Sequence, residues 1–257
     1  MSVRKQRLYR TAGIVLKRVD LGEADRILTL FTRDQGKLRA IAKGVRRTTS
    51  RSAGHLEPFT LSDLLLAVGR ELDVVSQAET IGAFRDVRED LVLTTHAYYL
   101  AELTDLLTED RMENRAAFGA LVDGFTALAE QAFHPRVVVI AFLLRLLDAL
   151  GYRPELTECV SCRAAITPGR NQFSAHLGGA LCPTCGPREM SARPIANDPL
   201  KLLRHLQRSG GRAPLNVAPE VSREAEALLR DYAEQIVERR LRTPALIARV
   251  QQVGGPS

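Results

Sequence analysis

The chain of 257 residues is long enough to bury one or two substantial cores, and its content of 45% hydrophobic and 26% charged residues excludes an intrinsically disordered protein. The net charge of +6 is unevenly distributed, because residues 1–55 hold 14 Lys and Arg against 4 Asp and Glu, a local balance of +10, and the remaining residues sum to −4. Basic charge concentrated in one part of a chain is typical of a polyanion-binding protein, with nucleic acid the commonest partner and an anionic membrane surface the second.

Short strands separated by turn residues are predicted for residues 8–84. The turns fall at Leu21-Gly22, at "DQG" (residues 34–36) and at Gly69-Arg70, which gives five strands in about 75 residues. Five short strands with one long connection fit a small closed barrel, and the OB-fold is the five-stranded barrel most used for binding nucleic acid strands. An SH3-like barrel and an open sheet are the alternatives.

A basic segment follows the third predicted strand. In "KLRAIAKG" apolar residues alternate with Lys and Arg, and the loop that continues to Phe59 contains no acid before Glu57. Cations this close repel one another unless they are solvated or meet an anion. The segment is therefore either a solvated loop or a phosphate-binding surface, and its candidate DNA-binding residues are Lys37, Arg39, Lys43, Arg46, Arg47 and Arg51.

Helical periodicity replaces the strand pattern from residue 85 onward and resumes after residue 193. The most apolar run, Val137 to Leu144, predicts a buried central helix, and it is far shorter than the ~20 residues needed to cross a bilayer. The first residues are basic, with neither a following apolar stretch nor a cleavage signal, which predicts a cytoplasmic protein.

Four cysteines form two C-x2-C pairs separated by 19 residues: Cys159, Cys162, Cys182 and Cys185. Two such pairs complete a tetrahedral site of four thiolates, which predicts one structural Zn²⁺ that is coordinatively closed and does not activate water. Disulfides and free thiols are the alternatives, and a redox pair would sit in a βαβ context that is missing here. The intervening loop carries Arg163, Arg170, Phe173 and His176, which fit weak nucleic-acid binding but fit a solvated ribbon surface better.

No catalytic constellation emerges from the sequence. It has no P-loop, no dinucleotide fingerprint and no H-E-x-x-H, and the five histidines are scattered among different elements. A binding protein is therefore favoured over an enzyme. Aromatic residues amount to 5%, and Tyr9, Phe31 and Phe59 are more typical of strand cores than of base-stacking platforms, so charge-dominated, steeply salt-dependent binding is expected.

Two long stretches resemble the RecO family of recombination mediators. These are "GIVLKRVDLGEADRILTLFTRDQGKLRAIAKGVRR…SR…GHLEPF" and "LLRLLDALGYRPELTECVSC" with "CPTC", and the similarity extends over nearly the whole chain in the same order. The resemblance implies an α+β multidomain protein. The expected parts are an OB-fold at residues 1–84, a helical domain in two parts at 85–152 and 193–257, and an inserted zinc ribbon at 153–192.

The resemblance also implies a function and partners. Family members bind single- and double-stranded DNA, anneal complementary strands without ATP, and join RecR to load RecA onto strands coated with single-strand-binding protein. Binding the acidic, apolar C-terminal tail of that protein would need a cation beside apolar side chains, and Arg204 near Leu200 and Leu203 is one such neighbourhood. Without the resemblance, the alternatives are a zinc-ribbon RNA-binding or transcription-associated factor and, against the closed thiolate site, a zinc-dependent nuclease.

Overall fold

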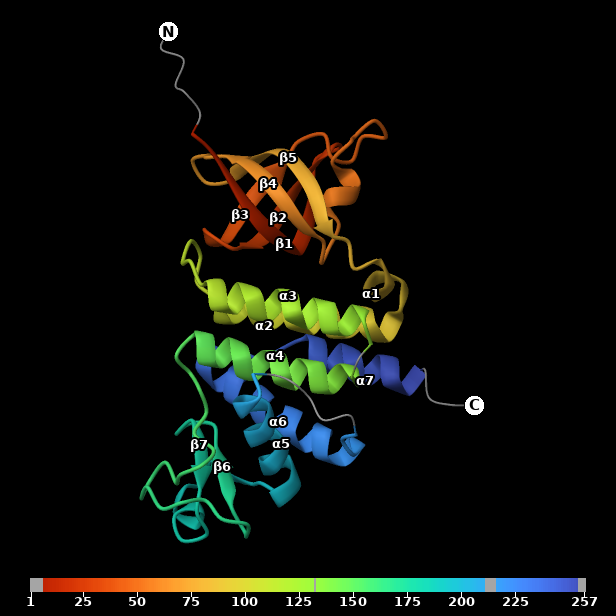
Figure 1. Cartoon of the computed structure of the whole chain (residues 1–257). Coiled ribbons are helices and arrows are strands. Elements are labelled where there is room, and N and C mark those ends of the chain that lie inside the picture. Colours follow the sequence, from red (N-terminus) through yellow and green to blue (C-terminus); the bar gives the residue numbers. More distant parts are fainter. Residues whose placement is uncertain (1–6, 132, 211–215, 254–257) are drawn as a thin grey trace.

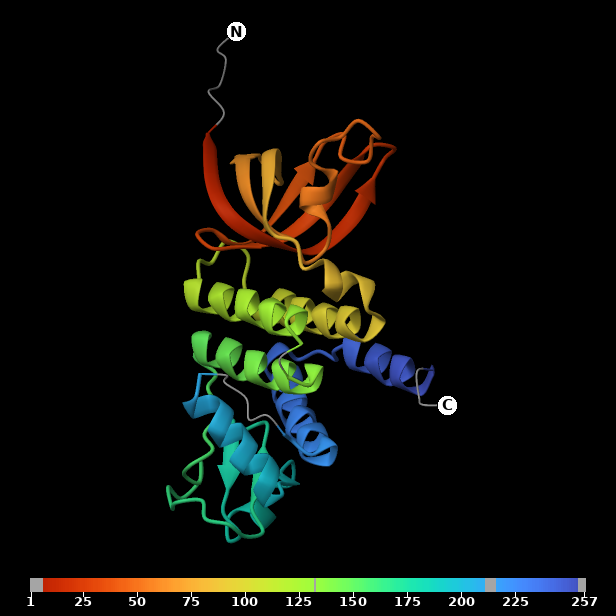
Figure 2. The same ribbon diagram turned by 45° about the vertical axis from the view of Figure 1, so that its right-hand side comes forward.

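The structure, a computed structural model, describes residues 7–131, 133–210 and 216–253. Three parts are stacked along one axis (Figure 1): a β-barrel, layers of helices beneath it, and a small ribbon at the opposite end. A view turned by 45° shows the same order of the three parts (Figure 2). The barrel and the ribbon are therefore at opposite ends of the molecule.

The barrel consists of β1 (Leu8–Leu21), β2 (Asp25–Thr32), β3 (Gly36–Ala42), β4 (Leu61–Ala67) and β5 (Asp73–Gly82). The strand order is β1-β2-β3-β5-β4, and the sheet closes because β1 also pairs with β4. Strands β3 and β5 run parallel and the other pairs are antiparallel. This closed, five-stranded order confirms the OB-fold over an SH3-like barrel or an open sheet.

Alternating side chains explain why these segments close into a barrel. In β3, Leu38 and Ala40 are buried inside while Arg39 between them is exposed. Strand β1 changes register between Val15 and Lys17, and such a bulge bends a long strand around a small barrel. The predicted turn ends at Gly36, whose φ of 62° lies in the left-handed region, and a Cβ there would be 2.0 Å from the backbone oxygen of Met112. Gly36 therefore lets the β2–β3 turn lie against the helical part.

The helices are α1 (Arg85–Glu89), α2 (Leu91–Leu107), α3 (Arg115–Ala129), α4 (Pro135–Ala149), α5 (Asn197–Arg208), α6 (Pro219–Val237) and α7 (Thr243–Val253). Every residue from Val137 to Leu144 is buried within α4, which confirms the predicted central helix. Side-chain caps begin α2 and α3, where Asp90 accepts from Leu93 N and Asn114 accepts from Ala117 N. No helix in the described part of the chain is long and apolar enough to cross a membrane.

One hydrophobic core runs through the barrel base, the helices and the ribbon. On the barrel side, Phe31 is fully buried, and its ring centroid lies 6.2 Å from that of Phe118 in α3. On the ribbon side, Phe173 contacts Tyr232 of α6 edge to face at 6.1 Å. These contacts fix the barrel to α3 and the ribbon to α6, and the shared core of the helices joins the two.

The ribbon contains β6 (Gln172–Ser174), β7 (Gly179–Leu181) and β8 (Arg193–Pro194), in the order β7-β6-β8. Its sheet thus extends two residues beyond the predicted end of the ribbon at residue 192. Strand β5 ends at Gly82 and α1 begins at Arg85, on either side of the predicted boundary at residue 84. The division of the chain into domains stays a prediction.

A polar cluster also joins the barrel to the helical part. Asp73 is 1% exposed and accepts hydrogen bonds from the Tyr9 hydroxyl and from Gly69 N, while Arg111 Nη2, from the α2–α3 loop, lies 2.9 Å from its Oδ2. Burial and the hydrogen bond to Asp73 raise the pKa of Tyr9 to about 12. The folded state therefore favours the neutral phenol.

Alkaline pH is expected to weaken the fold through Tyr9. Because the folded pKa is about 12 and the unfolded value is about 10, the contribution of Tyr9 to stability is complete below pH 10 and is lost as pH rises through 12. Chemical unfolding of the wild type and of Tyr9→Phe between pH 8 and pH 12 measures this difference. We expect a shallower loss for Tyr9→Phe, and equal losses would contradict the assignment.

Candidate nucleic-acid interface and metal centre

The backbone of the basic β3–β4 loop is held against the β1–β2 hairpin. Gly44 N donates to Asp25 Oδ1 at 2.7 Å, and Arg46 N donates to Ala24 O at 2.9 Å. Val45 between them is 2% exposed and packs in the barrel core. The chain is therefore fixed at this point while the neighbouring basic side chains point outward.

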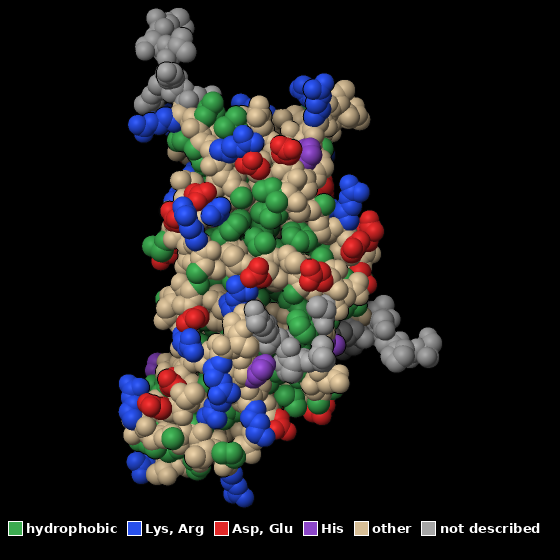
Figure 3. Space-filling view, in the orientation of Figure 1, with side chains coloured by type: hydrophobic (Ala, Val, Ile, Leu, Met, Phe, Trp, Pro, Cys, Tyr) green, Lys and Arg blue, Asp and Glu red, His purple; other side chains and the backbone are tan. Residues whose placement is uncertain are grey.

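Five of the six candidate DNA-binding residues are exposed: Arg39, Lys43, Arg46, Arg47 and Arg51. Apart from Arg46, none of them has an ion pair with any residue that the structure describes. Figure 3 shows Lys and Arg side chains projecting at the end of the barrel where the β3–β4 loop lies in Figure 1. These cations are available to an anionic partner.

Arg46 is only partly available. Its Nε lies 3.5 Å from Asp20 Oδ2, and its Nη1 donates to Gly22 O at 2.9 Å. The side chain keeps 34% of its surface exposed. Arg46 thus fastens the loop to the β1–β2 turn and presents only part of its guanidinium to solvent.

Lys37 lies in a different environment from the other candidate DNA-binding residues. Its side chain is 13% exposed, and its ammonium contacts Asp105 Oδ1 at 3.4 Å and Asp110 Oδ1 at 3.5 Å, besides donating to Asp105 O. The physical reason is that the β3 end at Lys37 lies on the helical part. Two carboxylates there already compensate the charge.

Glu57, the first acid after the basic segment, does not neutralise the loop. Arg26 Nη1 lies 3.3 Å from Glu57 Oε1, and Arg18 contacts the other carboxylate oxygen. Arg26 also contacts Asp20 at 3.0 Å. Asp20 and Glu57 are therefore paired with Arg18, Arg26 and Arg46 and not with Arg39, Lys43, Arg47 or Arg51.

Strand pairing adds a cation that the sequence pattern did not single out. Lys17 is opposite Thr29, and Thr29 is opposite Arg39, so Lys17 and Arg39 lie in one row across β1, β2 and β3. Lys17 is exposed and has no ion-pair partner in the part of the chain described here. Only the register of the closed sheet could have identified it.

An apolar row lies beside this basic row on the same outer face. Val19 is opposite Ile27, Ile27 is opposite Ile41, and Val19 is 52% exposed. Such side chains offer surface to the faces of unpaired bases. By contrast Phe31 and Phe59 are buried at 0% and 1%, which confirms their interpretation as core residues, while Tyr9 is half-buried with its hydroxyl donating to Asp73.

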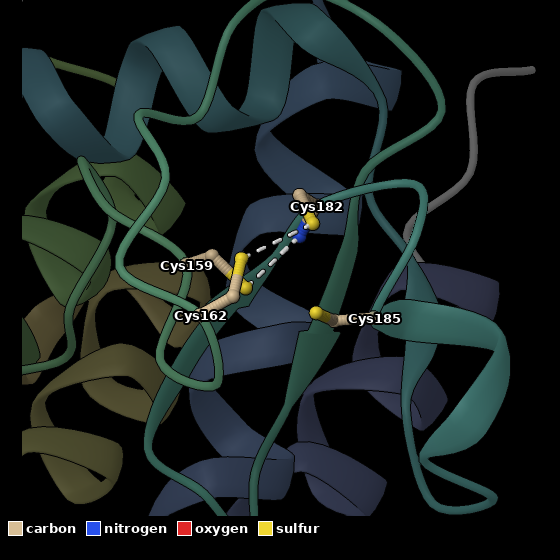
Figure 4. A group of neighbouring side chains, drawn as sticks. All are labelled: Cys159, Cys162, Cys182 and Cys185. Atoms are coloured by element: carbon tan, nitrogen blue, oxygen red, sulfur yellow. Dashed lines mark hydrogen bonds between the residues drawn. The ribbon is translucent and has the colours of Figure 1, made fainter.

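The four cysteines converge from two turns (Figure 4). Their sulfurs all lie within 4.8 Å of one another, and Cys162 Sγ is 3.8 Å from Cys182 Sγ. A tetrahedron with Zn–S bonds of about 2.3 Å has edges of about 3.8 Å, so this pair already has the spacing of two ligands on one metal. The residues present therefore fit a tetrahedral metal site.

Backbone hydrogen bonds hold both cysteine turns. Arg163 N donates to Cys159 O at 2.9 Å with Arg163 at a φ of 65°, and Gly186 N donates to Cys182 O at 2.9 Å.

The cysteine thiols differ in acidity. Burial raises the pKa of Cys159, but N–H groups of Cys182, Cys162 and Ser161 outweigh it and lower the pKa to about 6. For Cys185, the Ser161 hydroxyl lowers the pKa, while hydrogen bonds with the other thiols raise it to about 11. Four thiolates at neutral pH would therefore need a cation among them.

The ribbon is attached to α5 through Arg204. Its Nε donates to Leu156 O and its Nη2 to Ile166 O, both at 2.8 Å, while Leu200 and Leu203 are 2% and 0% exposed. Arg204 with these leucines is therefore not an open peptide groove, because the cation is bound to carbonyl groups and the leucines belong to the core. Phe173 in the ribbon is also buried, which leaves its ring unavailable to nucleic acid.

Three of the five histidines, His55, His96 and His134, have structural contacts. His96 is 2% exposed with its Nδ1 2.7 Å from Val92 O, and burial lowers its pKa. His134 Nδ1 accepts from Arg136 N at the start of α4, and His55 Nδ1 lies 2.8 Å from Thr80 Oγ1. Within the described residues, the cysteine cluster is the one group of three or more potential metal ligands.

Comparisons with known proteins agree with this architecture. The family model described as Recombination protein O N terminal matches residues 5–84, and the model described as Recombination protein O C terminal matches residues 88–245. The chain is 42% identical over 254 residues to the DNA repair protein RecO of Roseiflexus sp. (strain RS-1), covering 97% of this chain and 88% of the relative. It is 39% identical over 246 residues to the DNA repair protein RecO of Bifidobacterium adolescentis, covering 93% and 99%.

Proposed function

Because the chain belongs to the RecO family of DNA repair proteins, which are mediators rather than enzymes, we propose that it binds single- and double-stranded DNA and anneals complementary strands without ATP. The observation that carries this proposal is the group of exposed cations on β3 and its following loop. Arg39, Lys43, Arg47 and Arg51 have no acidic partner among the described residues. The residues form the DNA-binding surface in our proposal, with Arg46 beside them and Lys17 added.

Annealing follows from the chemistry of this surface. Two strands repel one another through their phosphates, and exposed Lys and Arg side chains reduce that repulsion by replacing condensed counterions. Contacts to phosphate position a strand without reading its sequence, so base edges stay free to find their complements. The apolar row of Val19, Ile27 and Ile41 offers a neighbouring surface for base faces.

The metal in our proposal is one structural Zn²⁺, held by Cys159, Cys162, Cys182 and Cys185. The support is the spacing of the sulfurs and the lowered pKa of Cys159. A bound zinc supplies a cross-link between the two turns, and with four thiolates it has no open coordination position. The ribbon then stabilises the end of the molecule opposite the barrel.

The partners in our proposal are RecR, RecA and single-strand-binding protein. With RecR, the protein would help to load RecA onto strands coated with single-strand-binding protein, in the cytoplasm and at the nucleoid. The support is the family assignment. Engagement of the acidic tail of single-strand-binding protein needs a cation that is free, and Arg204 does not meet this condition because its guanidinium is bound to Leu156 O and Ile166 O.

The proposed function is tested by annealing. Two complementary labelled strands, bare or precoated with single-strand-binding protein, are mixed with the wild type without ATP, and duplex formation is followed by energy transfer between the labels. We expect faster duplex formation than the strands alone show, in both states. The variant with Arg39, Lys43, Arg47 and Arg51 all changed to Ala is expected to lose the acceleration, because it cannot neutralise the phosphates.

Two controls make the annealing result specific. Non-complementary strands show whether the signal reports pairing or mere aggregation, and structured RNA as competitor separates a DNA mediator from an RNA-binding factor. If the protein accelerates duplex formation by bare strands but not by coated strands, the mediator function is contradicted and the annealing activity is supported. No acceleration of either kind by the folded wild type would contradict the proposal.

A further inference from the structure

A cavity of about 340 Å³ lies where the barrel meets the helices. Its lining comes from β1, from α2 and from the turn between α6 and α7, and includes Leu16, Lys17, Tyr98, Leu106, Arg239 and Arg242. The volume falls within the range of about 300–1,000 Å³ typical of pockets that hold small ligands. Apolar side chains and cations thus line one hollow.

The acids of the cavity are already bound within the protein. Glu102 accepts from Arg242 N and Thr243 N, both at 2.8 Å, and so caps the beginning of α7. Asp105 is engaged by Lys37. The Glu102 charge is therefore stabilised by backbone N–H groups and the Asp105 charge by an ammonium, and the cations that line the cavity outnumber these two acids.

Three cations of the cavity are free to contact an anionic ligand. Arg240 pairs with Glu234 at 3.6 Å, but Lys17, Arg239 and Arg242 have no ion pair with any residue in the described ranges. All three are exposed. The turn that carries the two arginines is fixed, because Leu241 is 8% exposed and its N–H donates to Glu234 Oε1 at 3.0 Å.

Tyr98 is the aromatic residue of the cavity. It is 43% exposed, unlike the buried rings of the barrel, and its ring lies edge to face against Phe59 with the centroids 4.8 Å apart and the planes at 77°. Phe59 is itself 1% exposed, so it holds the Tyr98 ring in a fixed position. A fixed, exposed aromatic ring among cations is the combination that binds single-stranded nucleic acid.

Lys17 connects this cavity to the barrel surface. The same residue lines the cavity and begins the row that leads through Thr29 to Arg39. A strand that follows the cations across β3, β2 and β1 therefore arrives at the cavity. The three cations could bind either a nucleic acid strand or an acidic peptide. Because they continue the row of cations on the barrel, a nucleic acid strand is the favoured ligand.

We propose that the cavity is a second segment of the single-strand path, in which Tyr98 stacks on one unpaired base and Lys17, Arg239 and Arg242 contact the flanking phosphates. This inference rests on the proposed function, because it extends the path from the barrel onto the helical part. It assigns to α2 and the α6–α7 turn a part in recognising unpaired bases. A duplex has no unpaired base to place there.

The test measures the affinity of the full-length protein for oligothymidines from below to above the length that one OB-fold binds, about 4–16 nucleotides, and for a duplex. The variants are Tyr98→Leu, Tyr98→Phe and, as a matched exposed tyrosine elsewhere, Tyr152→Leu, which is 46% exposed in the wild type. We expect Tyr98→Leu to bind long single strands roughly tenfold more weakly, with short strands and the duplex unchanged. Tyr98→Phe and Tyr152→Leu are expected to behave as wild type.

A second variant covers the case in which Tyr98→Leu does not fold. The double variant Arg239→Glu, Arg242→Glu changes exposed side chains only. Like Tyr98→Leu, it is expected to bind long single strands more weakly than the wild type does, with short strands unchanged. A 5-iodouracil-substituted strand is expected to cross-link to Tyr98 of the wild type on irradiation. Absence of the cross-link together with wild-type affinities of the variants at every length would overturn the inference.

The outcomes also separate this inference from the proposed function. If no strand of any length binds the wild type, the proposed function fails. If all strands bind but the Tyr98 and arginine variants match the wild type, only the cavity is wrongly assigned. Binding of an acidic, apolar peptide that requires Tyr98 and Arg242, with strand affinities indifferent to both, would give the cavity to a peptide and overturn the inference.

Discussion

Replacing Arg39, Lys43, Arg47 and Arg51 together with Ala is expected to weaken single-stranded DNA binding by roughly 10²–10³-fold at 0.1 M salt. Each cation that neutralises a phosphate of a single strand contributes a slope of about 0.7 in log affinity against log salt, and four such contacts produce this loss. Fluorescence anisotropy of a labelled oligothymidine measures the two affinities. The effect is large because the four side chains have no internal partner among the described residues.

The matched control removes the same charge from the other parts of the molecule. Arg170, Arg188, Arg208 and Arg223 are also exposed and without an ion pair in the described part of the chain, and they lie in the ribbon and on α5 and α6. Changing these four to Ala lowers the net charge equally. We expect affinity within about threefold of the wild type at 0.1 M salt, since distant exposed charges are largely screened.

Both variants are expected to keep the wild-type stability. Exposed side chains without partners contribute within about 0.5 kcal/mol each, so thermal unfolding shows whether a loss of binding reflects a loss of fold. Lys37 would be a poor choice for such a variant. Its removal would leave the Asp105 and Asp110 carboxylates without their cation at the contact between barrel and helices.

Changing Cys162 to Ser is expected to reduce bound zinc from about one per chain to nearly none and to unfold the ribbon locally. Cys162 is exposed, so the substitution removes a ligand without leaving a cavity in the core, whereas Cys159 is fully buried. Structural zinc sites contribute about 10–16 kcal/mol in zinc-finger peptides, and losing one of four ligands forfeits much of the site's contribution. Zinc is measured by elemental analysis and ribbon order by limited proteolysis.

Thr184→Ala is the control for this substitution. Thr184 is exposed in the second cysteine turn and its side chain is not a ligand, so zinc content and proteolysis are expected to match the wild type. DNA binding by Cys162→Ser is expected to persist, because the barrel lies at the opposite end of the molecule (Figure 1). Equal zinc in Cys162→Ser and the wild type, or no zinc in the wild type, would contradict the proposed metal site.

The barrel could be predicted because its information is local. Alternating strands, Gly and Asp turns and one long basic connection together define a five-stranded barrel, and closure follows from the pairing of β1 with β4. The cysteine cluster was equally accessible, since each C-x2-C pair forms its own turn. The central helix followed from an apolar run too short for a membrane.

The sequence could not predict in the same way which Lys and Arg side chains are exposed and which are paired within the protein. Lys37 and Arg39 are two residues apart on one strand face, yet Lys37 meets Asp105 and Asp110 from a segment about 70 residues away, while Arg39 remains exposed. Arg204 is a similar case. Its neighbouring leucines suggest an apolar groove beside a cation in the sequence, but its guanidinium donates to Leu156 O and Ile166 O in the structure. Long-range ion pairs and hydrogen bonds decide these cases, and they depend on tertiary structure.

Lys17 and Tyr98 illustrate the converse. Neither belongs to a motif, and Tyr98 lies in a helix whose other aromatic neighbour, Tyr99, is fully buried. Strand register places Lys17 in one row with Arg39, with Thr29 of β2 between them, and the contact of the barrel with α2 places Tyr98 and Lys17 in the lining of one cavity. Residues brought together by two different elements carry no signal in a single sequence.

If exposed cations of the barrel bind the phosphate backbone, the affinity for single strands falls steeply as the salt concentration rises. Dissociation constants of the wild type and of the Arg39, Lys43, Arg47 and Arg51 to Ala variant are measured between 0.05 and 0.2 M salt, conditions in which counterion release is resolved as a slope. We predict a steep slope of log affinity against log salt for the wild type and a slope shallower by about 3 for the variant, since four phosphate contacts of about 0.7 each are lost. Equal slopes for the two proteins would contradict it.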